Sequence, residues 1–121
     1  MVQKTDAAGT AIAYRARIEA NQTESEEVLI GHLGAIGLEI PGLSPASAVF
    51  VKVANVSGGT FRRLQKEDVS GDWTVASGSG NKMISLAALL DPFSVLKVEI
   101  GSTQGAVRDF WFVVRRSDTA K

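Results

Sequence analysis

The segment 93-FSVLKVEIGSTQGAVRDFWFVVRR-116, preceded by 86-LAALLDP-92, decides the fold class of this chain. Its two apolar runs, 93–100 and 106–116, flank the polar, glycine-containing segment 101–105. Strand-length runs rich in β-branched and aromatic residues around a short loop are typical of a β-hairpin. We therefore expect these two runs to pair with each other at the centre of the fold.

The hydrophobic residues of this segment also predict which faces are buried. Leu96, Val98 and Ile100 share one face of the first run, as in a strand with one buried face. The second run is apolar at consecutive positions, so we expect it to be buried on both faces. Together with apolar positions of the other predicted strands, these residues form the predicted core: Ile12, Tyr14, Ile18, Val51, Leu96, Val98, Ile100, Phe110, Trp111 and Phe112.

The first half of the chain shows the same short-strand pattern. Residues 10–20 alternate between apolar and polar positions, which predicts a strand with one face toward water. Residues 36–40 alternate again, and we expect Pro41-Gly42 to end that strand before a linker at residues 43–47.

The second half predicts a further hairpin and a loop. Residues 48–53 and 60–64 are strand-like and flank Gly58-Gly59, a turn signal. Another strand is expected to begin at Trp73, and residues 77–81 (SGSGN) read as a flexible polar tip.

Together these patterns predict an all-β fold. Turn signals at about every 8–12 residues, without a long amphipathic helix, favour an antiparallel β-sandwich or jelly roll of about seven to eight strands. The same spacing permits a barrel. At most one short helical turn is expected, near residues 84–90. We expect a single domain at 10–117, a flexible or partner-ordered arm at 1–9 and a tail at 118–121.

The composition excludes several function classes. The 121 residues contain no cysteine, which excludes disulfides, thiolate metal sites and cysteine nucleophiles. Thirteen basic and thirteen acidic residues give a formal net charge of zero, so we expect no nucleic-acid or membrane partner. Because the start of the chain carries no apolar segment, we expect synthesis in the cytoplasm.

No pattern of catalytic or ligand-binding residues is found. His32 is the only histidine, which is too few for a transition-metal site in a chain without cysteine. The segment 77–80 lacks the context of a nucleophile elbow, and the glycines at 31, 34 and 37 lack that of a phosphate-binding loop. We therefore predict no enzyme activity, no catalytic residue, no metal and no cofactor.

Aromatic residues leave an alternative function open. Trp73, next to Asp72, is the best candidate for an exposed anchor. Together with Tyr14, Phe50 and Trp111 it would offer a sugar-stacking platform on one sheet face, as in a carbohydrate-binding β-sandwich. Arg62-Arg63 would contribute to a basic patch, but pairing with acidic groups is the favoured interpretation of these arginines.

Several segments resemble one group of small phage virion proteins, those of the head decoration or cement type. The matching segments are 37-GLEIP-41, 49-VFVKV-53, 59-GTF-61, 93-FSVLKVEIG-101, 104-QGA-106 and 108-RDF-110. The resemblance implies a β-sandwich that binds the major capsid protein on the capsid surface of the virion, as a homo-oligomer and by analogy a trimer. It implies no catalytic residue, and a tail or baseplate protein is a further alternative.

If the core holds the domain together, its partner contacts lie in the arm and the loops. The loop at residues 65–72 and the segment 77–81 are polar and therefore expected to be exposed. The candidate contact residues are Val2, Lys4, Thr5, Asp6, Gln65, Lys66, Glu67, Asp68, Trp73, Ser77, Ser79 and Asn81.

Overall fold

The computed structural model describes residues 3–5, 11–30, 35–65, 71–86 and 95–115, and their regular structure is entirely β. The predicted all-β class is thus confirmed. Eight strands form one antiparallel sheet in the order β1-β2-β8-β4-β7-β3, with β5 and β6 also paired to β4. The strands are β1 (Gln3–Thr5), β2 (Ala11–Ile18), β3 (Val28–Leu29), β4 (Ala35–Ala54), β5 (Arg62–Arg63), β6 (Thr74–Ser85), β7 (Val95–Ile100) and β8 (Arg108–Arg115).

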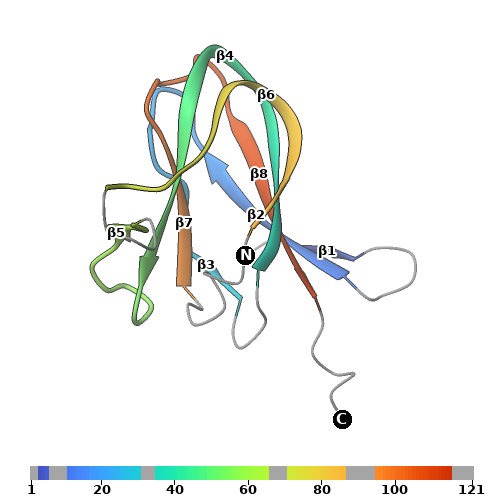
Figure 1. Ribbon diagram of the computed structural model, residues 1–121, viewed down its shortest axis with the longest axis vertical. Coiled ribbons are helices and arrows are strands. Elements are labelled where there is room, and N and C mark those ends of the chain that lie inside the picture. Colours follow the sequence, from blue (N-terminus) through green and yellow to red (C-terminus); the bar gives the residue numbers. More distant parts are fainter. Residues whose placement is uncertain (1–2, 6–10, 31–34, 66–70, 87–94, 116–121) are drawn as a thin grey trace.

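The long strand β4 organises the sheet by bending through both of its layers. Its first limb, residues 35–42, pairs with β8, and its second limb, residues 47–54, pairs with β7. β6 follows β4 along both limbs. Figure 1 shows β4 and β6 arching together over one end of the molecule, with β7 beside one limb and β8 beside the other. The arch turns a single sheet into two facing layers.

The predicted end of a strand at Pro41-Gly42 is wrong. The chain continues as one strand of 20 residues, and the register with β6 shifts between Gly42 and Ser47. Pro45, which follows a cis peptide bond, lies inside this register shift. Proline has no backbone N–H to donate. It is tolerated there because a residue at a bulge makes no ladder hydrogen bond.

The predicted hairpin between residues 93–100 and 106–116 is also wrong. β7 pairs with β3 and the second limb of β4, whereas β8 pairs with β2 and the first limb. The connection at 101–107 therefore crosses from one layer to the other. Each strand buries its apolar face from its own side of the core, so both are satisfied without pairing to each other.

The core lies between the two layers. The predicted core residues on β2, β4, β7 and β8 are buried, with two exceptions. Ile12 is partly buried and packs against the core. Trp111 is half-buried and lies between Phe110 and Phe112, both of which have no exposed surface. Because β8 has the core on one side only, alternate residues face outward, and the prediction that Trp111 belongs to the core is wrong.

The segment that follows β2 brings the sheet close to a closed barrel. The Ser25 N–H donates to the Val98 carbonyl at 2.9 Å, and its Oγ accepts from the Val98 N–H at 2.9 Å. The Glu26 N–H donates to the Arg17 carbonyl at 3.3 Å. This segment therefore links β7, in one layer, to β2, in the other.

Glycine in β6 permits the close approach of two strands at the arch. Gly80 has φ +79°, and a Cβ built on it would lie 1.9 Å from the Pro41 carbonyl oxygen. Only glycine fits this position, because it tolerates positive φ and has no Cβ. Residues 77–81 thus belong to β6, not to the flexible tip that was expected. Ile84 and Ser85 also belong to β6, so the helical turn expected from residue 84 is not formed there, and residues 87–90 lie outside the described residues.

Buried polar side chains fix the segments that cross between the layers. Gln104 is 1% exposed; its Oε1 accepts from the Ser44 N–H at 2.7 Å and its Nε2 donates to the Pro45 carbonyl at 2.9 Å. Ser47 Oγ accepts from the Gly101 N–H at 3.0 Å. These side chains satisfy backbone groups that strand pairing does not reach, which avoids the cost of burying them unpaired.

Candidate binding surface

The predicted contact residues do not form one surface. Lys4 and Thr5 lie in β1, which pairs with β2 at one end of the strand order. Three others, Ser77, Ser79 and Asn81, lie in β6, beyond β4 on the opposite side. β1 shows that part of the predicted arm joins the sheet. The predicted contacts Val2, Asp6, Lys66, Glu67 and Asp68 lie outside the described residues.

Most of the described contact residues lie on or beside β6, whose outer side we call the β6 edge (residues 74–85). β6 pairs with β4 along one side, and no strand of the described ranges pairs with the other. Ser77, Ser79 and Asn81 are exposed. Lys82 is the only charged residue of the strand, and its Nζ donates to the Ser77 carbonyl at 3.1 Å. A long edge with so little charge is suited to pairing with another strand.

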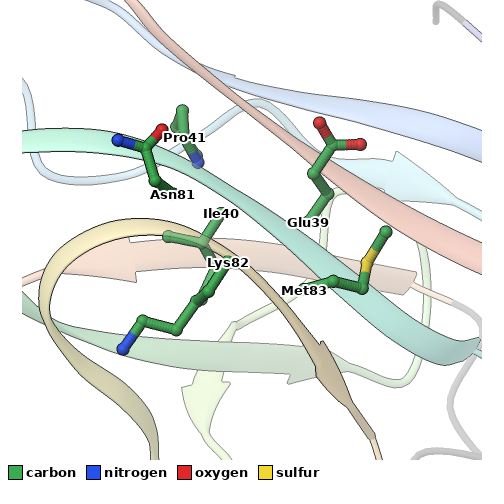
Figure 2. A pocket seen from close by; sticks show the side chains of 6 residues that line it. All are labelled: Glu39, Ile40, Pro41, Asn81, Lys82 and Met83. Carbon is green, nitrogen blue, oxygen red and sulfur yellow. The ribbon is translucent and has the colours of Figure 1, made fainter.

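An open depression of about 470 Å³ lies beside this edge, between β4 and β6. Its lining residues are Glu39, Ile40, Pro41, Asn81, Lys82 and Met83. Glu39 and Met83 are paired in register, and Figure 2 shows their side chains on the same side of the strands, with Lys82 directed to the other side. Met83 is 60% exposed, so an exposed apolar side chain lies at the centre of residues 82–84, where β6 keeps a regular register with β4.

Trp73 differs from the exposed anchor that was expected. It is partly buried and packs against the hydrophobic core. Its backbone N–H donates to the Leu64 carbonyl at 2.9 Å, which holds the start of β6 beside the β5 segment. The neighbouring Asp72 is engaged by Gln65 and Arg63, so the polar neighbourhood that suggested exposure is explained by these contacts.

The outer face of β5, β7 and the second limb of β4 carries charges that neutralise each other. We call Glu24, Lys52, Arg63, Asp72, Lys97 and Glu99 the charged face. Arg63 Nε lies 2.6 Å from Glu99 Oε1, and its Nη1 lies 2.9 Å from Asp72 Oδ2. The hydrogen bond to Glu99 is the largest cause of the raised pKa of Arg63.

A second part of the charged face centres on Glu24. Lys52 Nζ lies 2.6 Å from Glu24 Oε2, and Lys97 Nζ lies 3.5 Å from Glu24 Oε1. The hydrogen bond from Lys52 lowers the pKa of Glu24 against the opposing effect of burial. With acids and bases paired in this way, the charged face offers little uncompensated charge to a partner.

The aromatic rings of this face are covered by cations. The Arg63 guanidinium carbon lies 4.0 Å from the centre of the Phe50 ring, and Lys97 Nζ lies 4.5 Å from the centre of the Phe61 ring. These are cation–π contacts. The rings are therefore occupied by the protein's own side chains, and Arg63 is committed to acidic partners within the chain.

A separate ion pair ties β2 to β8. Arg17 Nε and Nη2 donate to the two carboxylate oxygens of Asp109 at 2.8 and 3.1 Å. This bidentate geometry is the strongest form of such a pair. The hydrogen bond from Arg17 lowers the pKa of Asp109. Nearby, Arg15 Nε lies 3.7 Å from Glu26 Oε2.

Comparison with known proteins adds no family. No protein-family model matches the chain, and no curated protein matches it. In the part of the chain that the structure describes, no three His, Cys, Asp or Glu residues gather in a way that would hold a metal ion. Among the same residues, no helix is long and apolar enough to cross a membrane.

Sequence reasoning missed the two features that matter most for the surface. The β6 edge was hidden because the SGSGN segment carries loop-forming residues, and only the partner strand β4 makes it extended. Met83 was also missed, since its exposure depends on β6 having no second neighbour among the described strands. A polar residue between two glycines, as at Ser79, was the only available sign of a bent strand.

Proposed function

We propose that this protein is a phage head decoration protein that binds at junctions between major capsid subunits and stabilises the head. Two observations support the proposal: the resemblance of the segments between residues 37 and 110 to small virion proteins, and the β6 edge. The edge carries the argument, because it gives the rigid domain a long, nearly uncharged strand that can add to a sheet of another protein.

Strand addition suits a cementing role for a physical reason. Main-chain hydrogen bonds supply contacts that do not depend on the partner's sequence, and Met83 adds apolar burial worth about 25 cal/mol per Å². Only the surplus over the entropy lost on association appears as affinity. A rigid domain loses little further entropy on binding, and many copies on one head sum their contributions.

The protein would accordingly be located on the capsid surface, with the major capsid protein as partner and further copies of itself nearby. The carbohydrate-binding alternative has less support. Tyr14 is buried, Trp73 packs against the core, and Phe50 lies beneath Arg63. These three rings are therefore poorly placed to stack on a sugar.

Co-sedimentation with expanded capsids that lack the protein tests the proposal. We expect saturable binding and heads that better resist heat and chelator. Ser79→Lys, on the β6 edge, should weaken binding by about tenfold or more, whereas Thr103→Lys, at an exposed position of the 101–107 connection, should not. Absence of binding, together with unchanged heat and chelator resistance, would refute the cementing role.

A further inference from the structure

We propose that a second copy of this chain pairs with the β6 edge, through antiparallel contact between residues 82–84 of the two copies around a two-fold axis at Met83. The pairing would join the two sheets side by side. It goes beyond the decoration role, which does not require a contact between copies. Because it uses the same edge, it applies to the free protein, and self-pairing and binding to the capsid through β6 exclude each other.

The backbone of residues 82–85 is ready for such pairing, whereas Asn81, with φ +56°, lies at a bend and has no place in the regular register. Lys82, Met83 and Ile84 follow a regular antiparallel register with Ile40, Glu39 and Leu38 on one side. In an antiparallel strand, backbone N–H and C=O groups point alternately to the two sides. The groups that point away from β4 meet no other strand within the described ranges, and they form a template for a further strand.

The side chains of this segment complement themselves. With Met83 on the axis, the exposed Met83 of each copy faces the same residue of the other. Lys82 then faces Ile84 of the second copy. Directly opposed like charges are therefore avoided, and apolar residues meet at the centre.

A second copy fits the edge for two further reasons. The formal net charge of zero means that no long-range repulsion separates identical chains. A two-fold axis also needs only one surface, since each copy supplies the strand that the other lacks. This symmetry differs from the trimer that the family resemblance implies.

Light scattering on the free, full-length protein provides the first test. We expect a mass of twice the 12.8 kDa chain at high micromolar concentration. Met83→Lys would place two like charges on the axis and should raise the dissociation constant by about tenfold or more. Val56→Lys is the matched control, because Val56 is 62% exposed but lies beyond β4 at the turn toward β5; it should leave the mass unchanged.

Cross-linking tests the register. The chain contains no cysteine, so Met83→Cys introduces a single thiol, and we expect rapid formation of a disulfide-linked dimer under mild oxidation. Val56→Cys should cross-link much more slowly. A monomeric or trimeric mass, a dimer that survives Met83→Lys, or equal cross-linking of both cysteine variants would overturn the proposal. Because no capsid is present, failure here is distinct from failure of the decoration role.

Discussion

β8 and β6 pair with the same limb of β4 but have opposite surroundings. β8 has β2 as its second neighbour, and its residues Phe110, Phe112 and Val114 have no exposed surface. β6 has β4 alone among the described strands, and all of its residues are exposed or only partly buried. The comparison teaches that burial is divided unequally: β8 holds the two layers together, while β6 keeps an exposed side, to which the proposed function assigns a partner.

The largest effect that would test this division is a cavity in the β8 layer. Phe112→Ala should lower the free energy of unfolding by about 3–5 kcal/mol, because it removes a fully buried ring from between the layers. Chemical denaturation measures the change. Met83→Ala on β6 is the control and should stay within about 0.5 kcal/mol of the wild type. A similar loss from both variants would show that the two strands are not divided in this way.

The second-largest effect on stability concerns the close approach of β4 and β6 at the arch. Gly80→Ala should cost about 2–3 kcal/mol, because the added Cβ meets the Pro41 carbonyl in a backbone conformation with positive φ. Gly58 has a similar φ of +75° but open space around it, so Gly58→Ala should cost only about 1 kcal/mol. Thermal unfolding of both variants compares them; equal losses would mean that the close approach of β4 and β6 is unimportant.

The connection at 101–107, which crosses between the layers, is expected to contribute somewhat less to the free energy of unfolding. Gln104→Leu should cost about 2 kcal/mol, because it leaves the Ser44 N–H and the Pro45 carbonyl without their partner. Thr103→Leu changes the exposed neighbour and serves as the control. Denaturation curves give both values, and a neutral Gln104→Leu variant would mean that water replaces the side chain.

The smallest effect concerns the carboxylates held in ion pairs and depends on pH. The lowered pKa values of Glu24 and Asp109 mean that the unfolded state binds more protons near pH 4, so stability is complete above that range and falls as the pH drops through the lowered pKa values. Glu24→Gln should cost about 0.5 kcal/mol at pH 7. The variant and the wild type should converge at acid pH, once the pH has fallen through the lowered pKa of Glu24 and the carboxylate is protonated. A constant difference across pH would contradict the role of this charge.

The sequence was sufficient to predict the class of the fold and much of its core. Alternation identified the inward residues of β2 and β7 without knowledge of their partners, because one buried face imposes a period of two. The hairpin through Gly58-Gly59 also forms, with Lys52 opposite Arg63. These features depend on neighbours in the sequence, which is why local patterns reveal them.

Long-range pairing could not be predicted in the same way. Residues 93–116 have every local sign of a hairpin, yet β7 and β8 bind different limbs of β4. The wrong prediction that Trp111 belongs to the core has a related cause, since a central strand of a two-layer fold still has one outer face. The β6 edge is open because no strand of the described ranges pairs with the outer side of β6. A local sequence pattern carries no information about such long-range pairing.

Copy number on the virus particle tests the central claim most directly. Under the proposed decoration role, quantitative mass spectrometry of purified virions would compare the amount of this protein with that of the major capsid protein. The account predicts a stoichiometry approaching one copy per coat subunit. Absence from the particle, or the few copies typical of a tail or baseplate component, would contradict the decoration role.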